Sequence, residues 1–204
     1  LRGLVGSEMC IRDRMNIIKS QECLKFTGKD ALSFVDSLIS NTVKTDKLFF
    51  SYLLAPDGKI INWFICETIN NEFYIYQEAE NLKNLHQIFN KYKIRIKCEL
   101  EVINKEKIFS LEISNDSISI NEIFESSQIT SWTDFELIAE LPSKKILENG
   151  LIPNEVSWLD SFVDYDKGCF MGQEQTSRIK FRGRPRRLLK TCLLYTSDAA
   201  DECS

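Results

Sequence analysis

The N-terminal part of the chain has one apolar run of strand length, followed by a segment with helical spacing. Residues 23–28 (CLKFTG) predict a strand that ends at Gly28, and residues 29–40 (KDALSFVDSLIS) predict a helix. The apolar positions that share one face of this helix are Ala31, Val35, Leu38 and Ile39. We therefore expect this helix to pack against a core.

Residues 47–78 contain three apolar, β-branched and aromatic runs separated by PDGK and INNE. These separators are turn signals, so the pattern predicts three antiparallel strands. Residues 79–94 form an amphipathic pattern that predicts a helix, with Leu82, Leu85, Phe89 and Tyr92 directed inward. Two further strands are expected, at 95–103 (RIKCELEVI) and 107–113 (KIFSLEI).

The periodic spacing of apolar residues is weak in the Ser- and Asn-rich residues 115–133. Beyond them, residues 135–142 (FELIAELP) predict a strand, and residues 143–150 (SKKILENG) predict a helix that ends at Gly150. The order strand, helix, strands, helix, strands indicates an α+β fold in which helices pack on antiparallel sheets.

The two ends of the chain are related through their coding sequence. The residues MCIRDR (9–14) and CLLYTS (192–197) can be back-translated into reverse complements of one DNA word. We therefore expect residues 1–14 and 191–204 to derive from a translated adapter, and these segments are excluded from the fold reasoning. Met15 is the expected natural start, and the natural protein is expected to continue beyond Lys190.

Removing these ends takes away three basic and five acidic residues, so the net charge changes from −4 to −2. That balance gives no global argument for binding nucleic acid or a membrane. The remaining cysteines are Cys23, Cys66, Cys98 and Cys169. They are widely spaced, so we expect no metal site or iron–sulfur cluster held by this chain alone. No signal peptide or spanning apolar run follows Met15, which favours a cytoplasmic location.

One stretch, DKGCFMGQEQTSR (166–178), carries the strongest chemical signal. Gly168 and Gly172 permit backbone angles that side chains forbid and let a ligand approach closely. Gly172 is followed by good helix formers, so Cys169 is expected near a helix N-terminus and beside Lys167, and both features favour the thiolate. The competing interpretation is a small buried thiol beside an ordinary surface ion pair between Glu174 and Arg178.

Two other features of the sequence are candidates for a functional role. His86, the only histidine, lies on the predicted amphipathic helix and is expected to be a boundary or surface residue rather than a base for Cys169. Residues 178–187 (RIKFRGRPRR) hold five arginines and one lysine, which suits a phosphate, an RNA or a polyanionic cofactor tail. No aromatic ladder accompanies them, so a small anionic ligand is favoured over RNA.

The stretch KGCFMGQEQTSRIKFRG closely resembles the signature of the YgfZ family of folate-binding proteins, which belongs with the aminomethyltransferases (GcvT proteins) of glycine cleavage. The matching positions are Lys167, Gly168, Cys169, Phe170, Gly172, Gln173, Glu174, Arg178, Arg182 and Gly183. A weaker resemblance extends from about residue 17 to residue 187 and includes FTGKDALSFVDSLISNTV and LLAPDGKII.

The resemblance implies a GcvT/YgfZ-like fold in residues 15–190, with the first two interleaved α+β domains present, an inserted part at about 46–114, and the C-terminal β-barrel absent. It implies tetrahydrofolate or a derivative as the ligand, contacted by the signature residues Lys167, Gly168, Gly172, Gln173, Glu174 and Arg178. The segment ILENGLIP would place Glu148 against the pterin, where a carboxylate can accept two parallel hydrogen bonds.

The resemblance also implies a function: a tetrahydrofolate-binding factor that supports iron–sulfur cluster assembly or repair in client enzymes, with Cys169 as the functional thiol. Direct contact with nucleic acid or a membrane is not expected. Where aminomethyltransferases carry a catalytic aspartate, this chain has Ile61, Asn62 and Trp63, so we predict no classical aminomethyltransferase activity. The alternatives are a folate-dependent one-carbon transferase and a protein associated with RNA modification.

Overall fold

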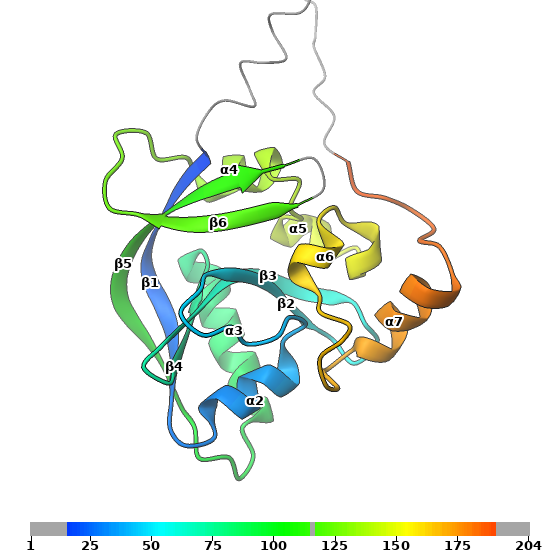
Figure 1. The fold of residues 1–204 in the computed structure, drawn as a ribbon, viewed down its shortest axis with the longest axis horizontal. Coiled ribbons are helices and arrows are strands. Elements are labelled where there is room, and N and C mark those ends of the chain that lie inside the picture. Colours follow the sequence, from blue (N-terminus) through cyan, green and yellow to red (C-terminus); the bar gives the residue numbers. More distant parts are fainter. Residues whose placement is uncertain (1–15, 115–116, 191–204) are drawn as a thin grey trace, which may run out of the picture.

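The computed structural model describes residues 16–114 and 117–190. The expected adapter-derived ends, 1–14 and 191–204, and the expected start at Met15 lie outside the described residues. The described part is an α+β structure, as the sequence predicts (Figure 1).

One antiparallel sheet organises the described residues. Its order is β2-β3-β4-β1-β5-β6, and its strands are β1 (Asn16–Thr27), β2 (Phe49–Leu54), β3 (Ile60–Ile69), β4 (Glu72–Tyr76), β5 (Glu99–Ile113) and β6 (Ile118–Ile123). The sheet curls until its edge strands β2 and β6 approach each other. The strands β2, β3 and β4 and the turns between them lie where the sequence places them. The division into two interleaved domains, with an insert at 46–114, stays a prediction.

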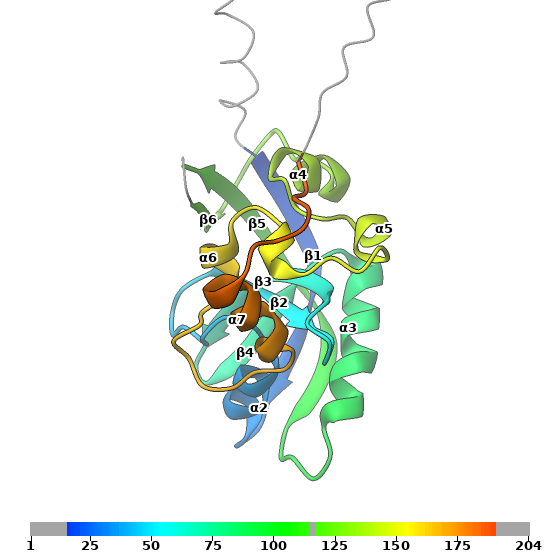
Figure 2. The same cartoon turned by 90° about the vertical axis from the view of Figure 1, so that its right-hand side faces the viewer.

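Each face of the sheet carries its own apolar core because successive side chains point to opposite faces. Helices α2 (Ala31–Leu38) and α3 (Ala79–Tyr92) cover the outer face, as Figure 2 shows. Phe26 lies against Phe89 there, with ring centroids 5.0 Å apart. The concave face is filled by residues from α4 (Trp132–Ile138), α5 (Lys144–Leu147) and α6 (Leu159–Phe162). The 3₁₀-helix η1 (Pro153–Glu155) and helix α7 (Gln173–Arg182) complete the described chain.

The two strands expected at 95–103 and 107–113 are one strand, β5. The polar residues between the two apolar runs stay in register because β5 pairs with β1 along nearly its whole length. A bulge in β5 takes up the irregularity, since between the pairs Ser20–Lys107 and Glu22–Asn104 one residue of β1 lies opposite two residues of β5. The loosely patterned segment also contains a strand that the sequence analysis missed, β6, which pairs with the end of β5.

The prediction of a strand at 135–142 is wrong, because the first residues of this segment belong to helix α4. The Ser131 hydroxyl accepts a hydrogen bond from the Asp134 amide, a helix N-cap. Phe135 and Ala139, one helical turn apart, are then both fully buried in the concave core. The inward placement of Tyr92 is also wrong: it ends α3 and is 38% exposed.

Candidate functional site

The chain between α6 and α7, residues 164–172, is called the KGC loop below, and its lysine is directed into the protein. The Lys167 ammonium donates to the carbonyl oxygens of Asp36, Ile39 and Asn41 at 2.7–3.1 Å and lies 3.1 Å from the Asp36 carboxylate. Its side chain is 3% exposed, and burial lowers the pKa of Lys167. The lysine therefore fastens the KGC loop to the C-terminal end of α2.

Asp164 adds a second connection between the same segments. Its carboxylate accepts a hydrogen bond from the Thr42 hydroxyl, and its amide donates to the Ser40 carbonyl at 3.0 Å. The hydrogen bond from Thr42 holds the pKa of Asp164 below its ordinary value. Residues 40–42, more than 120 positions earlier in the chain, thus lie directly against the KGC loop and hold it by hydrogen bonds.

Gly172 fixes the other end of the KGC loop against the turn between β2 and β3. Its φ is +78°, and a Cβ there would lie 2.5 Å from the Ala55 carbonyl oxygen. Gly58 faces it from that turn, with φ of +83° and room for no Cβ because Gln175 would be 2.8 Å away. Two of the sequence segments that carry the family resemblance, LLAPDGKII and KGCFMGQE, therefore meet backbone to backbone.

Between Lys167 and Gly172, the KGC loop exposes Gly168 and Cys169, whereas Phe170 is buried in the concave core. Cys169 is exposed, whereas Cys23, Cys66 and Cys98 are buried. Burial raises the pKa of Cys23 to about 11 and raises that of Cys66 well above its ordinary value. The buried-thiol interpretation of Cys169 is therefore wrong, and among the described cysteines Cys169 is the thiol that a ligand or partner can reach.

Gly168, next to Cys169, corrects one expectation from the sequence. Its φ is outside the left-handed region, so its backbone does not need glycine. An added Cβ would have no atom within 4 Å. The requirement for glycine that the sequence suggested at both positions holds only at Gly172.

Helix α7 carries the signature residues that follow the KGC loop, from Gln173 at its first position to Arg182 at its last. It begins directly after Gly172, as predicted, so Gln173 and Glu174 lie at its N-terminus. Glu174 and Arg178 form the predicted surface ion pair, with 3.2 Å between Oε1 and the guanidinium nitrogen. Both side chains are exposed and free to rearrange around a ligand.

Glu148 lies at the C-terminal end of α5, where the backbone turns through Gly150 with φ of +71°. Its carboxylate is exposed and forms no hydrogen bond with the described residues. The segment that follows touches the β2–β3 turn, because the Ile60 amide donates to the Leu151 carbonyl at 2.7 Å. The β2–β3 turn therefore lies between the ILENGLIP segment on one side and the KGC loop on the other.

The β3 residues at the position of the family aspartate are directed into the protein. Asn62 and Trp63 are buried. Trp63 Nε1 donates to Glu136 Oε1 at 3.2 Å, and burial raises the pKa of Glu136 to about 7. This carboxyl is not among the predicted site residues, because the apolar pattern of residues 135–142 predicts a strand there. A Ser-x-x-Asp helix start at Ser131 was the signal that could have found it.

An ionic network around the buried side chains of Lys107 and Glu67 was also missed. The Lys107 ammonium lies 2.7 Å from Glu67 on β3 and 2.6 Å from Glu122 on β6, and Tyr76 donates to Glu67 at 2.7 Å. Every charge in this group has a partner, which is the condition for burying ions without a large cost. We assign the network a structural role, because the contact between Lys107 and Glu67 joins β5 to β3, which is not its neighbour in the sheet.

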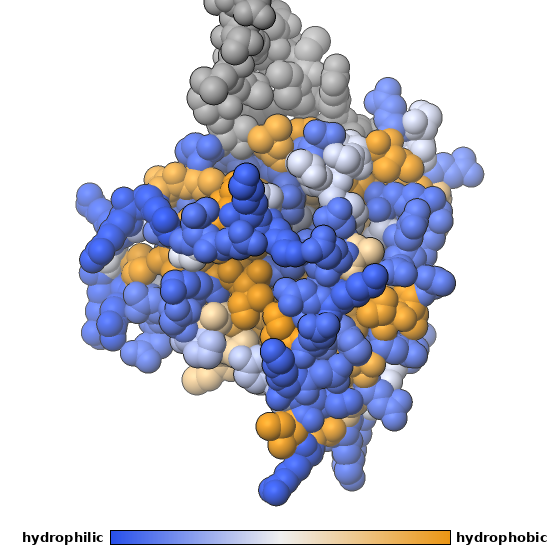
Figure 3. Space-filling model, turned by 180° about the vertical axis from the view of Figure 1, so that it is seen from behind, coloured by the Kyte–Doolittle hydropathy of each residue, from blue (hydrophilic) through white to orange (hydrophobic). Residues whose placement is uncertain are grey.

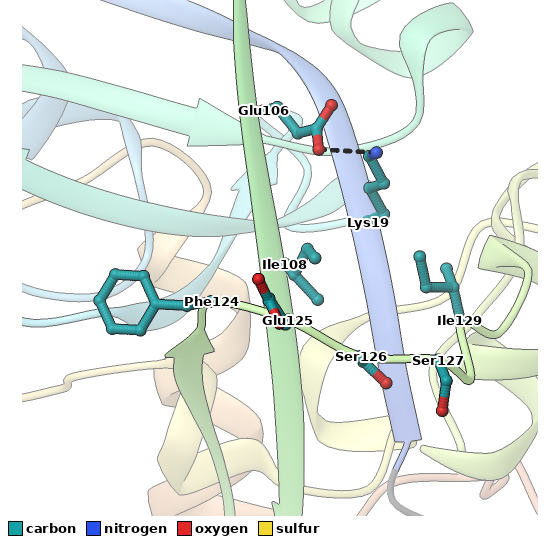
Figure 4. A pocket seen from close by; sticks show the side chains of 8 residues that line it. All are labelled: Lys19, Glu106, Ile108, Phe124, Glu125, Ser126, Ser127 and Ile129. Carbon is teal, nitrogen blue, oxygen red and sulfur yellow. Dashed lines mark ion pairs between the residues drawn. The ribbon is translucent and has the colours of Figure 1, made fainter.

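A shallow groove lies on the outer face of β1 and β5, away from these segments. Its lining residues are Lys19, Glu106, Ile108, Phe124, Glu125, Ser126, Ser127 and Ile129 (Figure 4). The predicted site residues are not among them. Seen from behind, the surface is mainly hydrophilic and carries separate hydrophobic patches (Figure 3).

His86 faces Asn90 on α3 at 2.9 Å, which fits the surface role that the sequence predicts. Within residues 16–114 and 117–190, no group of three His, Cys, Asp or Glu side chains is arranged to hold a metal ion. The helices of the same ranges include none with the length and apolar character that crossing a bilayer requires.

Comparison with known proteins gives relatives for the chain as a whole. No family model matches it. It is similar to two proteins named iron-sulfur cluster assembly factor IBA57 homolog, mitochondrial. The one from Neurospora crassa is 22% identical over 97% of this chain, and the one from Pyricularia oryzae is 21% identical over 91%. The chain spans 57% and 58% of the length of these relatives.

Among solved structures, the chain is similar to the glycine cleavage system aminomethyltransferase T from Bartonella henselae. The sequence identity is 15% and the TM-score is 0.43, and the alignment covers 50% of this chain and 30% of that one.

Proposed function

We propose that this protein supports the assembly or repair of iron–sulfur clusters in client enzymes, with tetrahydrofolate as its ligand and Cys169 as its functional thiol. The premise is the YgfZ/GcvT-like fold family, which the curated relatives support. The observation that carries the proposal is the similarity, over 97% of the chain, to a protein named as an iron–sulfur cluster assembly factor. The relatives are named as mitochondrial, and a cytoplasmic location for this chain stays a prediction.

The arrangement around Cys169 suits a thiol that acts on a partner. The KGC loop is fixed at Lys167 and Gly172, so the exposed Cys169 is presented without a large loss of conformational freedom when a partner binds. An exposed thiol can attack, exchange with or transiently ligate a group on another molecule, which a buried thiol cannot. Neither a resident cluster nor a bound metal is needed for that role.

The ligand part of the proposal uses the groups around the β2–β3 turn. Glu148 is exposed and without a hydrogen-bond partner among the described residues, so its carboxylate is free to accept two parallel hydrogen bonds from the amino-pyrimidinone edge of a pterin. Gly168, Gln173, Glu174 and Arg178 are the further candidate contacts. Lys167 acts on the ligand by positioning the KGC loop, because its ammonium is already bound to α2.

The thiol role is tested with the protein and a client [4Fe–4S] enzyme whose activity reports cluster content. We expect Cys169→Ser to bind tetrahydrofolate within about twofold of wild type and to lower client activity at least tenfold. Asp166→Asn, an exposed change in the same loop, is the matched control and should leave both unchanged. Full client activity with Cys169→Ser would exclude the thiol role.

The ligand role is tested separately by titration calorimetry with tetrahydrofolate. We expect Glu148→Gln to weaken binding about tenfold, because a charge-assisted hydrogen-bond pair is replaced by a neutral one. Unchanged affinity would remove Glu148 from the site. Tetrahydrofolate-dependent formation of a one-carbon product would instead favour the transferase alternative.

A further inference from the structure

We propose that three arginines just beyond the thiol, Arg182, Arg184 and Arg186, form a docking site for an acidic segment of a partner protein. They are called the arginine stripe below. That the partner is an iron–sulfur client rests on the proposed function, whereas the docking chemistry stands on the observations that follow.

The end of the described chain carries a strong local charge. Residues 173–190 contain seven basic residues and one acidic residue, Glu174, in a chain whose net charge is −4. The positive charge is therefore concentrated on α7 and the segment after it, while the rest of the chain is acidic. Such a concentration attracts an anionic partner to one place on the surface.

The basic residues of this segment divide into two groups. Four of them are paired with acids of the protein: Arg178 with Glu174, Lys180 with Asp160, Arg187 with Glu155, and Lys190 with Glu140. The arginine stripe is the other group. Its side chains are exposed, and they form no ion pair with the described residues.

The contacts of the chain after α7 explain this division. Arg187 reaches the Glu155 carboxylate at 3.0 Å and the Gly150 carbonyl at 3.1 Å, and the Leu189 amide donates to the Glu155 carbonyl at 2.7 Å. These contacts hold residues 187–189 on the protein. The stripe is thus presented from a segment whose position is fixed on both sides, by α7 and by Arg187, and a partner need not order it.

The chemistry of the surface favours a protein partner over RNA. Each guanidinium can bind a carboxylate with two parallel hydrogen bonds. Phe181 (70% exposed) and Leu188 (62% exposed) flank the stripe, and arginine beside large apolar side chains is typical of protein interfaces. Base stacking would need several free aromatic rings, whereas Phe181 already lies edge-on to Tyr165, with ring centroids 5.7 Å apart.

The position of the stripe relates it to the thiol. Helix α7 joins the KGC loop to the stripe, and its ten residues span about 15 Å. Figure 2 shows α7 on the surface, with the loop before it and the segment after it on the same side of the molecule. A segment bound at the stripe therefore holds its own protein within reach of Cys169.

The test measures the binding of a fluorescein-labelled twelve-residue peptide of alternating Glu and Leu to the protein by fluorescence anisotropy. We expect Arg182→Ala/Arg184→Ala/Arg186→Ala to weaken binding at least tenfold. Replacing Glu by Gln in the peptide should have the same effect. Raising NaCl from 50 to 500 mM should weaken wild-type binding several-fold, because exposed charges are screened.

The matched control removes the same charge elsewhere. Lys29, Lys83 and Lys91 are exposed and form no ion pair with the described residues, so their triple Ala variant should bind the peptide like wild type. An equal loss of peptide affinity in this control would show that net charge alone explains the effect, and would overturn the proposal. Tighter binding of a twelve-nucleotide oligouridylate than of the peptide would overturn it in favour of RNA.

The docking site and the proposed function can fail separately. Cys169→Ser should bind the peptide like wild type while client activity falls. If the stripe variant keeps full peptide binding while Cys169→Ser abolishes client activation, the docking site alone is wrong. If peptide binding depends on the stripe but Cys169→Ser is fully active, the docking site stands and the thiol role is wrong.

Discussion

Two pairs of residues in the KGC loop differ in how well they should tolerate substitution: Lys167 and Gly172 are packed against other segments, whereas Gly168 and Cys169 are exposed. Lys167 is 3% exposed with four acceptors within 3.1 Å, and Gly172 touches the backbone of the β2–β3 turn. By contrast, Gly168 has no neighbour near an added Cβ, and Cys169 is exposed. The signature therefore combines residues that build the loop with residues that the built loop presents.

A second contrast separates the Lys167 ammonium from the Glu136 carboxyl. Both are largely removed from water. Lys167 is surrounded by carbonyl oxygens and a carboxylate, whereas Glu136 has one donor, Trp63 Nε1, and the like charge of Glu78 near it. Burial lowers the pKa of Lys167, against the opposing effect of Asp36, and burial raises the pKa of Glu136, against the opposing effect of the hydrogen bond from Trp63.

The largest effect is expected at Lys167. Lys167→Met leaves the Asp36 carboxylate and three carbonyl groups without their shared donor, and should lower the free energy of unfolding by about 3–5 kcal/mol. Urea denaturation measures this. Lys91→Met, at an exposed position, is the control and should change stability by less than about 0.5 kcal/mol. A loss below about 1 kcal/mol for Lys167→Met would mean that the ends of the loop are no more fixed than its middle.

Gly172→Ala should come next, with a loss of about 2–4 kcal/mol. The new Cβ would press on the Ala55 carbonyl oxygen, and φ of +78° is costly for alanine. Gly183→Ala is the matched change at the other end of α7, where φ is −145° and the nearest atom is 3.7 Å away. It should cost under about 1 kcal/mol, and equal costs at the two glycines would refute the close contact.

Glu136→Gln should have a smaller effect that depends on pH. The folded-state pKa of about 7 is above the ordinary value of 4.5, so the folded state binds the proton more tightly, and stability falls as pH rises between these values. The variant should therefore be more stable than wild type at pH 8, by about 1 kcal/mol after allowing for partial exposure. At pH 4.5 the two should be equal. Melting temperatures at both pH values test this, and an equal shift at both would contradict it.

Gly168→Ala should have the smallest effect on stability, within about 0.5 kcal/mol. The backbone angle suits alanine, and the added methyl group meets open space. The same variant also tests where the ligand binds, because its added methyl group would obstruct a folate that passes close to Gly168. Lower tetrahydrofolate affinity at unchanged stability would place the ligand there, whereas a large loss of stability would show that the middle of the loop is packed after all.

The sequence predicted best where one segment determines its own structure. The turns at 56–59 and 69–72, the helix start after Gly172 and the ion pair between Glu174 and Arg178 all depend on residues a few positions apart. The apolar faces of α2 and α3 followed from periodicity for the same reason. The errors arose where alternatives were close: α4 has apolar residues that fit a strand as well as a helix, and the cap at Ser131 and the packing of Phe135 decided between them.

The sequence by itself determined strands β2, β3 and β4, the turns between them and the presence of a glycine-bounded cysteine beside a basic segment, because these depend on local periodicity and local backbone freedom. Only the tertiary structure decided that Lys167 faces inward, that Cys169 is exposed, that Glu136 lies beside Trp63 and that three of the arginines are left unpaired by the described residues. The reason is physical. The partners of a polar group come from distant parts of the chain, as Asn41 does for Lys167 across 126 positions, and no local pattern specifies them.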